Sequence, residues 1–321
     1  MTTNRRALLA APLVISALTH SALAQSGAIR LIVGFPPGGS TDLVARLLAP
    51  HLSAILGSPV VVENRPGASG ALGAQAVARA APDGNTWAVV FDTHAVNPFL
   101  IPSLGYDTRR DLTPICLVGT APNLVLRHRT RPLADFAALL TAARVRPDTL
   151  TYGTIGNGSL AHLAMSQAQA NGGFKVVHVP YRGGGPLVVA AASAECDLYV
   201  ATLTIFAAML AEGIVVPLAV TSAQRYGQLP NVPTLAEVGV PGIDARAFWG
   251  VLGPAGLPVA VKARMEAACR QALALPEVRA RLTDPLGIEV VAGDGAVFSS
   301  FLEQQMEISG RVVRENNIRP D

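Results

Sequence analysis

Two segments of the chain share one order of features: a short apolar strand, a glycine-rich loop, a serine and a helix. In the first, strand 28–33 and loop 35–39 precede Ser40 and a helical apolar pattern that stops at Gly57. In the second, strand 150–152 and loop 153–158 precede Ser159 and a helix that ends at Gly172. Such alternation predicts an α/β fold with largely parallel sheets.

The rest of the chain continues this alternation. Further strands are predicted at 60–62, 86–91, 115–118, 124–126, 176–179, 197–201, 218–221 and 248–252, and helices at 133–143, within 259–282 and from Val297 to Val312. Pro122 separates two of these strands and could mark a crossing between domains. Thr234 and Glu237 have the spacing of a capping box, which predicts the start of a short helix.

Length and composition limit the class of protein. The 321 residues allow two domains, and a chain that is 50% hydrophobic and 15% charged is not disordered. A formal net charge of +3, with 5% aromatic residues, does not suggest a nucleic-acid binder. The three cysteines, Cys116, Cys196 and Cys269, are too far apart for a CxxC metal site or a disulfide scaffold.

The N-terminus has the three parts of a secretory signal. Arg5 and Arg6 precede an apolar run at 7–18 and an Ala22-Leu23-Ala24 site, so we expect cleavage after Ala24. A membrane anchor is the alternative, but the apolar run is shorter than the ~20 residues that a spanning helix needs. The paired arginines also permit twin-arginine export. Export without an anchor predicts a periplasmic protein.

The two loops could bind an anion, because each places backbone N–H groups at the positive end of a helix. The alternative is that they are ordinary strand-to-helix loops with capping serines, and spacing alone favours this alternative. Asp42 lies in the first turn of the first helix, where an acid usually stabilises the dipole and would repel a carboxylate.

Several side chains near these loops are of types that bind ligands or act in catalysis. His162 could donate to an anion at the second loop or pack locally, whereas for His94 and Asn97 a loop-capping role is favoured. No Walker A motif, H-E-x-x-H motif or paired-cysteine site occurs in the sequence. A secreted hydrolase that uses Ser159 and His162 is an alternative, but no orienting acid is evident.

A set of motifs resembles the Bug family, the periplasmic substrate-binding receptors of tripartite tricarboxylate transporters. The matching segments are 30–42 (RLIVGFPPGGSTD), 62–68 (VENRPGA), 81–84 (APDG), 156–159 (GNGS) with His162, 179–183 (VPYRG), 220–222 (VTS), 233–237 (PTLAE) and Trp249-Gly250. Each motif is weak alone, but together they cover nearly the whole mature chain in the right order.

This resemblance implies a two-lobed α/β periplasmic-binding fold of type II, with a ligand cleft between lobes that close about a hinge. Each lobe would be a mostly parallel sheet flanked by helices, with one domain at 25–121 plus 225–321 and the other at 122–224. It also implies a receptor for a small organic carboxylate, not an enzyme, without cofactor or metal. The implied partners are the transporter's membrane subunits. A sensor subunit that presents its ligand-bound form to a membrane kinase is a separate alternative, and we expect a monomer.

The resemblance carries ligand contacts onto matching positions. One wall would hold Phe35, Gly38, Gly39, Ser40, Thr41 and Asp42; the other would hold Gly156, Asn157, Gly158, Ser159 and His162; Gly67, Ala68 and Tyr181 would lie near the mouth. Amino-acid-binding members have an acid where this chain has Ala201, so we expect no preference for zwitterionic amino acids. Ala194-Glu195 replaces the family's usual Gly-Gln pair, which could alter a turn.

Overall fold

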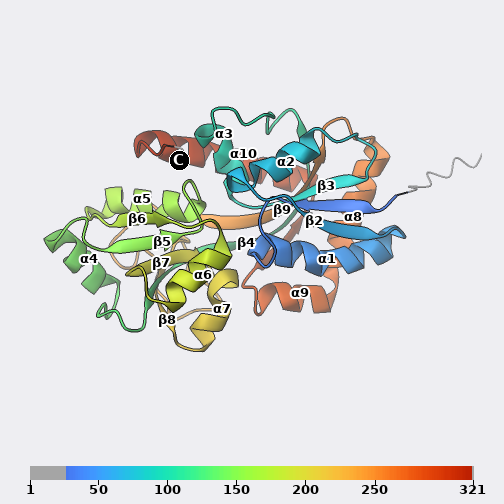
Figure 1. Cartoon of the computed structure of the whole chain (residues 1–321). Coiled ribbons are helices and arrows are strands. Elements are labelled where there is room, and N and C mark those ends of the chain that lie inside the picture. Colours follow the sequence, from blue (N-terminus) through green and yellow to red (C-terminus); the bar gives the residue numbers. More distant parts are fainter. Residues whose placement is uncertain (1–26, 320–321) are drawn as a thin grey trace, which may run out of the picture.

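The computed structural model describes residues 27–319, which fold into two lobes that lie side by side (Figure 1). The predicted signal peptide, residues 1–24, lies outside this described part of the chain. Within residues 27–319, no helix is long and apolar enough to cross a membrane.

The first lobe is built from both ends of the described chain. Its elements are β1 (Ile29–Val33), α1 (Ser40–Leu56), β2 (Val60–Asn64), the short 3₁₀ turn η1 (Ala68–Gly70), α2 (Ala71–Ala78), β3 (Thr86–Val90), α3 (Thr93–Leu100), β9 (Arg246–Pro254), α8 (Val259–Ala274), α9 (Pro276–Thr283), β10 (Glu289–Gly293) and α10 (Gly295–Glu315). Strands β2, β1 and β3 run parallel, and β9 joins them antiparallel.

The second lobe is formed by the middle of the chain. Its elements are α4 (Phe136–Val145), β5 (Thr151–Thr154), α5 (Leu160–Gly172), β6 (Val177–Pro180), α6 (Gly184–Ala192), β7 (Leu198–Thr202), α7 (Leu203–Ala211) and β8 (Val215–Val220). Strand β5 pairs in parallel with β6 and β7. Both predicted strand–loop–serine–helix units are therefore present, one in each lobe, as β1–α1 and β5–α5.

A single long strand, β4 (Leu112–His128), connects the lobes and belongs to both sheets. It pairs with β9 as far as Pro122 and with β7 and β8 from Asn123 onward. The prediction that Pro122 marks the crossing is confirmed, but the prediction of two separate strands is wrong. Proline's fixed φ suits an extended chain, so Pro122 does not end the strand. The pairing partner of β4 changes directly after it.

The expectation of mostly parallel sheets also needs correction. The first sheet contains the antiparallel pairs β3–β9, β4–β9 and β4–β10, and the second contains β4–β7 and β4–β8. Each lobe is therefore a mixed sheet, because strands that connect two lobes must run in both directions.

Apolar side chains fill a separate core on each side of both sheets. Trp87 and Trp249 are fully buried between the first sheet and helices α1 and α8, together with Cys116 and Cys269. The three cysteines are buried and free. Contact with Cys116, together with burial, raises the pKa of the Cys269 thiol well above its usual value.

Residues 226–245 follow β8 and contribute to the second lobe. Tyr226 and Val232 pack in one of its cores, and Leu235 and Val240 pack in the other. We therefore propose that the second domain ends close to Arg246, rather than at the expected residue 224. The capping box within this segment forms as predicted, with reciprocal bonds between Thr234 and Glu237, but a turn follows it instead of the expected helix.

Candidate functional site

The loop between β1 and α1 is held in shape by Asp42. The Asp42 carboxylate accepts hydrogen bonds from Gly38 N (2.9 Å), Arg46 Nε (2.9 Å) and Asn64 Nδ2 (2.8 Å). Asn64 Nδ2 also donates to the Phe35 carbonyl at 3.0 Å, so this one amide joins β2 to both ends of the loop. Burial alone would raise the pKa of Asp42, but the bonds from Arg46, Gly38 and Asn64 hold it below its usual value.

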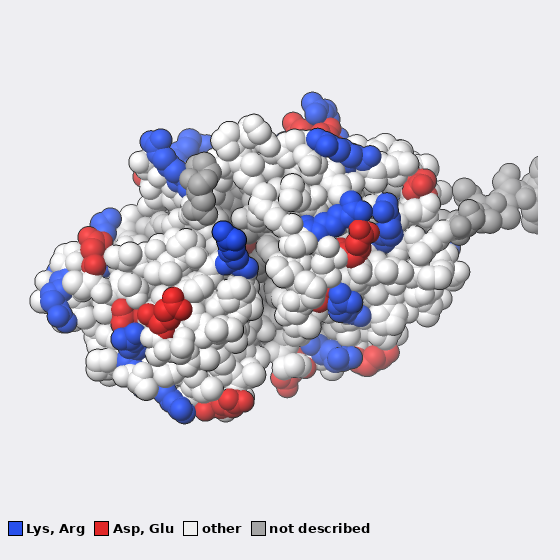
Figure 2. Space-filling view, viewed as in Figure 1, with Lys and Arg blue, Asp and Glu red and all other residues white. Residues whose placement is uncertain are grey.

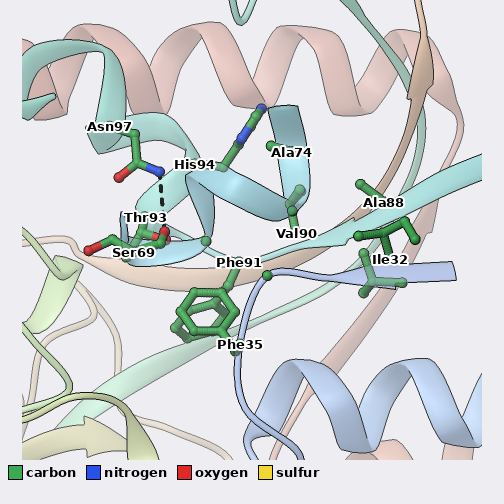
Figure 3. A pocket seen from close by; sticks show the side chains of 14 residues that line it. Ile32, Phe35, Ser69, Ala74, Ala88, Val90, Phe91, Thr93, His94 and Asn97 are labelled. Carbon is green, nitrogen blue, oxygen red and sulfur yellow. Dashed lines mark hydrogen bonds between the residues drawn. The ribbon is translucent and has the colours of Figure 1, made fainter. Parts of the chain in front are cut away.

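The η1 turn lies against this loop because both backbones carry glycine. A Cβ on Gly34 would lie 2.6 Å from the Cα of Gly70, so position 34 cannot accept a side chain, and Gly70 has φ +86°, a conformation that favours glycine. On the other side of the turn, Thr93 Oγ1 donates to the Ser69 carbonyl at 2.7 Å and Asn97 Nδ2 donates to it at 3.2 Å (Figure 3). Asn97 thus holds the turn, as the capping interpretation predicts.

His94 lies behind the turn rather than in a solvent-filled space. The ring is 3% exposed, and its Nδ1 lies 3.5 Å from the Tyr106 hydroxyl. Burial lowers the pKa of His94 to about 4, so the ring is neutral at physiological pH. This side chain is a core residue that does not supply charge to a ligand.

The loop between β5 and α5 is organised by its own helix end. Ser159 is the N-cap, and its hydroxyl accepts a hydrogen bond from His162 N at 3.3 Å. Gly158 N donates to His162 Nδ1 at 3.2 Å, and the His162 ring stacks on His178 with centroids 3.9 Å apart. Gly158 has φ +70°, and a Cβ there would lie 2.1 Å from Leu100. Local packing thus engages the His162 ring.

A cavity lies between the two loops, where the lobes face each other. Its larger part, the main chamber, has a volume of about 520 Å³. The main chamber is lined by Gly34, Phe35, Pro36, Pro66, Gly67, Ala68, Ser69, Gly70, Thr93, Ile155, Gly156, Asn157, Ser159, Tyr181, Arg182 and Gly183. Both loops, η1 and the segment after β6 therefore contribute to one site, and Figure 2 shows a largely uncharged furrow between the lobes.

A smaller part, the side chamber, has a volume of about 210 Å³. It is lined by Phe35, Pro36, Pro37, Gly39, Ser40, Thr41, Phe91, Ile155, Arg182, Gly183, Gly184, Gly185, Pro186 and Ile205. The two chambers share Phe35, Pro36, Ile155, Arg182 and Gly183. They are therefore adjoining parts of one cavity.

The structure brings most of the predicted ligand-binding residues to this cavity. Phe35, Gly67, Ala68, Gly156, Asn157, Ser159 and Tyr181 line the main chamber, and Gly39, Ser40 and Thr41 line the side chamber. Gly38, Asp42, Gly158 and His162 are not among the lining residues, and hydrogen bonds between Gly38 and Asp42 and between Gly158 and His162 hold the two loops. Contact between any of these residues and a ligand stays a prediction.

Arg182 is the main residue that sequence reasoning did not select. Among the described residues that line the two chambers, it is the one with a charged side chain. Arg182 belongs to the Tyr181-Arg182-Gly183 motif, directly before helix α6. This motif was part of the family resemblance, so it could have identified Arg182 as a candidate. The neighbouring Tyr181 directs its hydroxyl to Cys196 Sγ at 3.3 Å, and burial raises the Tyr181 pKa above its usual value.

The site also limits the possible chemistry. No group of three or more His, Cys, Asp or Glu side chains that could hold a metal ion occurs among residues 27–319. The Ser159 hydroxyl serves as a helix cap, and His162 Nδ1 accepts the Gly158 amide, an arrangement unlike a nucleophile activated by a base. Two α/β lobes around a cavity of amides, hydroxyls and one guanidinium are typical of solute-binding proteins.

Comparison with known proteins agrees with this class. Residues 44–318 match the model of the "Tripartite tricarboxylate transporter family receptor". The chain belongs to this family, which comprises solute-binding receptors and not enzymes.

Three solved structures of similar proteins have the same fold. "R. palustris Rpa4515 with adipate" is 31% identical, with a TM-score of 0.86, and the match covers 92% of this chain and 98% of that one. "MatC (Rpa3494) from Rhodopseudomonas palustris with bound malate" is 31% identical, with a TM-score of 0.82 and coverages of 89% and 98%. "Periplasmic binding protein BugD" is 28% identical, with a TM-score of 0.84 and coverages of 92% and 99%.

Proposed function

We propose that this protein is an extracytoplasmic receptor that captures a small organic carboxylate in the cavity between its lobes. The observation that carries the proposal is the cavity itself, whose walls combine backbone amides and hydroxyls with a single cation, Arg182. Such groups recognise a carboxylate through hydrogen bonds and one charge-assisted contact. The relatives that were solved with adipate and malate support the same ligand class.

Capture would involve closure of one lobe on the other. The connection where β4 changes its pairing partners, at Pro122 and Asn123, is the natural hinge. The site predictions extend this proposal: Phe35 and the 39–41 segment would close on one side of the ligand, and Gly156, Asn157 and Ser159 on the other.

The compartment and partners follow from the same proposal. Cleavage after Ala24 would release the receptor into the periplasm, where it would deliver its ligand to the membrane subunits of a tripartite tricarboxylate-type transporter. Presentation of the loaded receptor to a sensor kinase is an alternative use of the same closure. We expect a monomer, and a ligand bound without cofactor.

A thermal-shift screen of organic acids tests the proposal. A ligand at 100 times its dissociation constant should add about 2.7 kcal/mol to the free energy of unfolding. The protein should first be unfolded, dialysed and refolded, so that any co-purified ligand is removed. A melting curve that no organic acid shifts, after this treatment, would contradict the carboxylate receptor.

A further inference from the structure

We propose that the ligand is a monocarboxylate with an apolar body: Arg182 and the main chamber bind the carboxylate, and the side chamber takes the body. This inference rests on the proposed function and narrows its ligand class. It predicts a preference opposite to that suggested by a relative solved with the dicarboxylate adipate.

The side chamber has apolar walls from both lobes. Phe35 and Phe91 come from the first lobe, and Ile155 and Ile205 from the second. Phe35 meets Phe91 edge to face, with centroids 6.1 Å apart, and Phe91 packs on the buried Trp249 at 5.1 Å (Figure 3 shows the first pair). This aromatic wall is anchored in the core, so it offers a fixed apolar surface.

The cavity offers one cation, and that cation lies where the chambers meet. Arg182 lines both chambers and is exposed, and within residues 27–319 it forms no ion pair or hydrogen bond with another side chain. Its guanidinium is therefore available for a ligand. A carboxylate bound at this junction would leave the rest of the ligand next to the apolar walls.

The side chamber is unsuited to a second carboxylate, because Arg182 is the one cation among its described lining residues. Ser40 and Thr41 line it with neutral hydroxyls, and the nearby Asp42 is ion-paired with Arg46 at 2.9 Å, so that arginine is not available to a ligand. A second carboxylate would lose its hydration among the apolar side chains of the chamber without gaining a second cation. Ser40 and Thr41 can still accept or donate to a neutral polar group.

Hexanoate and adipate form a matched pair for the test, because they share six carbons and differ in whether the chain ends in methyl or carboxylate. We expect isothermal titration calorimetry on the refolded protein to give hexanoate at least about tenfold higher affinity than adipate, because burial of the terminal methyl group is favourable whereas burial of a second carboxylate without a cation is costly. Equal binding, or tighter binding of adipate, would overturn this inference but leave the carboxylate receptor intact. If neither these two nor any acid in the screen binds, both proposals fail.

A pair of variants locates the apolar subsite. Ile205→Ser removes apolar surface from the side chamber, so it should weaken hexanoate about fivefold or more and change adipate by less than about twofold. Val189→Ser is the matched control, because Val189 is 69% exposed on α6 and does not line either chamber. Equal loss of hexanoate affinity in both variants, or no loss in Ile205→Ser, would place the apolar body elsewhere and contradict the inference.

Discussion

Asn64 Nδ2 lies 2.8 Å from Asp42 Oδ1, and this contact ties the strand β2 to the first turn of α1. The same carboxylate also holds Gly38 and Arg46, so its role in the structure is to fix the loop that lines the cavity. The family resemblance places Asp42 on the ligand wall, whereas the residue-based interpretation gives it a structural role. The hydrogen bonds of Asp42 favour the structural role.

Asp42→Asn should therefore destabilise the protein. Loss of a charge-assisted hydrogen bond should lower the free energy of unfolding by about 1.5–3 kcal/mol. Chemical denaturation at pH 7 measures this free energy. Because the pKa of Asp42 is lowered on folding, its contribution is present above about pH 4 and is lost as pH falls through the folded value. The difference in the free energy of unfolding between the wild type and Asp42→Asn should shrink over the same pH range. Unchanged stability together with abolished ligand binding would instead put Asp42 in contact with the ligand.

The chain should show no preference for amino acids. Ala201, at the position where the family resemblance implies an acid in amino-acid-binding members, is 2% exposed within β7 and does not line either chamber. Aspartate and succinate differ only in the ammonium group, so a calorimetric comparison should show aspartate binding no more tightly. Tighter binding of aspartate would show that another acid receives the ammonium.

His178 should make stability depend on pH. Burial, followed by the nearby His162, lowers the pKa of His178 to about 3, whereas an unfolded histidine titrates near 6.5. Between these values the unfolded chain binds a proton that the folded chain does not, so stability falls as pH drops, by up to ~1.4 kcal/mol per pH unit. His178→Gln should flatten the urea-denaturation profile between pH 6 and 4. An unchanged slope would mean that His178 is charged in the fold.

Ala194→Gly should stabilise the protein. Ala194 has φ +55°, in the left-handed region that costs a residue with a Cβ about 1–2 kcal/mol. Glycine, which has no Cβ, removes this cost, although the more flexible unfolded chain offsets part of it. A rise of a few degrees in the melting temperature is expected. A lower melting temperature would show that the alanine methyl group makes a contact that outweighs the strain.

The sequence predicted local features better than long-range ones. The two strand–loop–serine–helix units have the predicted order because strand periodicity, glycine loops and serine caps act over a few residues, and Ser159 caps α5 as expected. The continuity of β4 through Pro122 depends on partners more than 70 residues away, which no local pattern contains. The turn after Thr234 shows the same limit, since a capping box marks a turn but does not ensure that a helix follows.

For the candidate site too, the sequence predicted the local loops better than the long-range packing around them. Both loops were identified from their glycines, but whether a side chain faces the cavity depends on packing across the lobes. Asp42 and His162 therefore do not line the cavity and instead bond with Asn64 and Gly158, although they stand close to lining residues in the sequence. Arg182 could have been selected from its motif, but only the assembled cavity shows that its charge is isolated there.

Calorimetric titration of hexanoate and adipate into three proteins tests the central claim most directly. These are the wild type, Arg182→Gln and the control Arg270→Gln, whose arginine is exposed on α8 away from the cavity. We predict one site per chain, about ten- to hundredfold weaker binding in Arg182→Gln, and control affinity within about twofold of wild type. Arg182→Gln binding both acids as tightly as the wild type would contradict the role of Arg182 in capture. No binding of these two or of any other organic acid by the wild type would contradict carboxylate capture in this cavity.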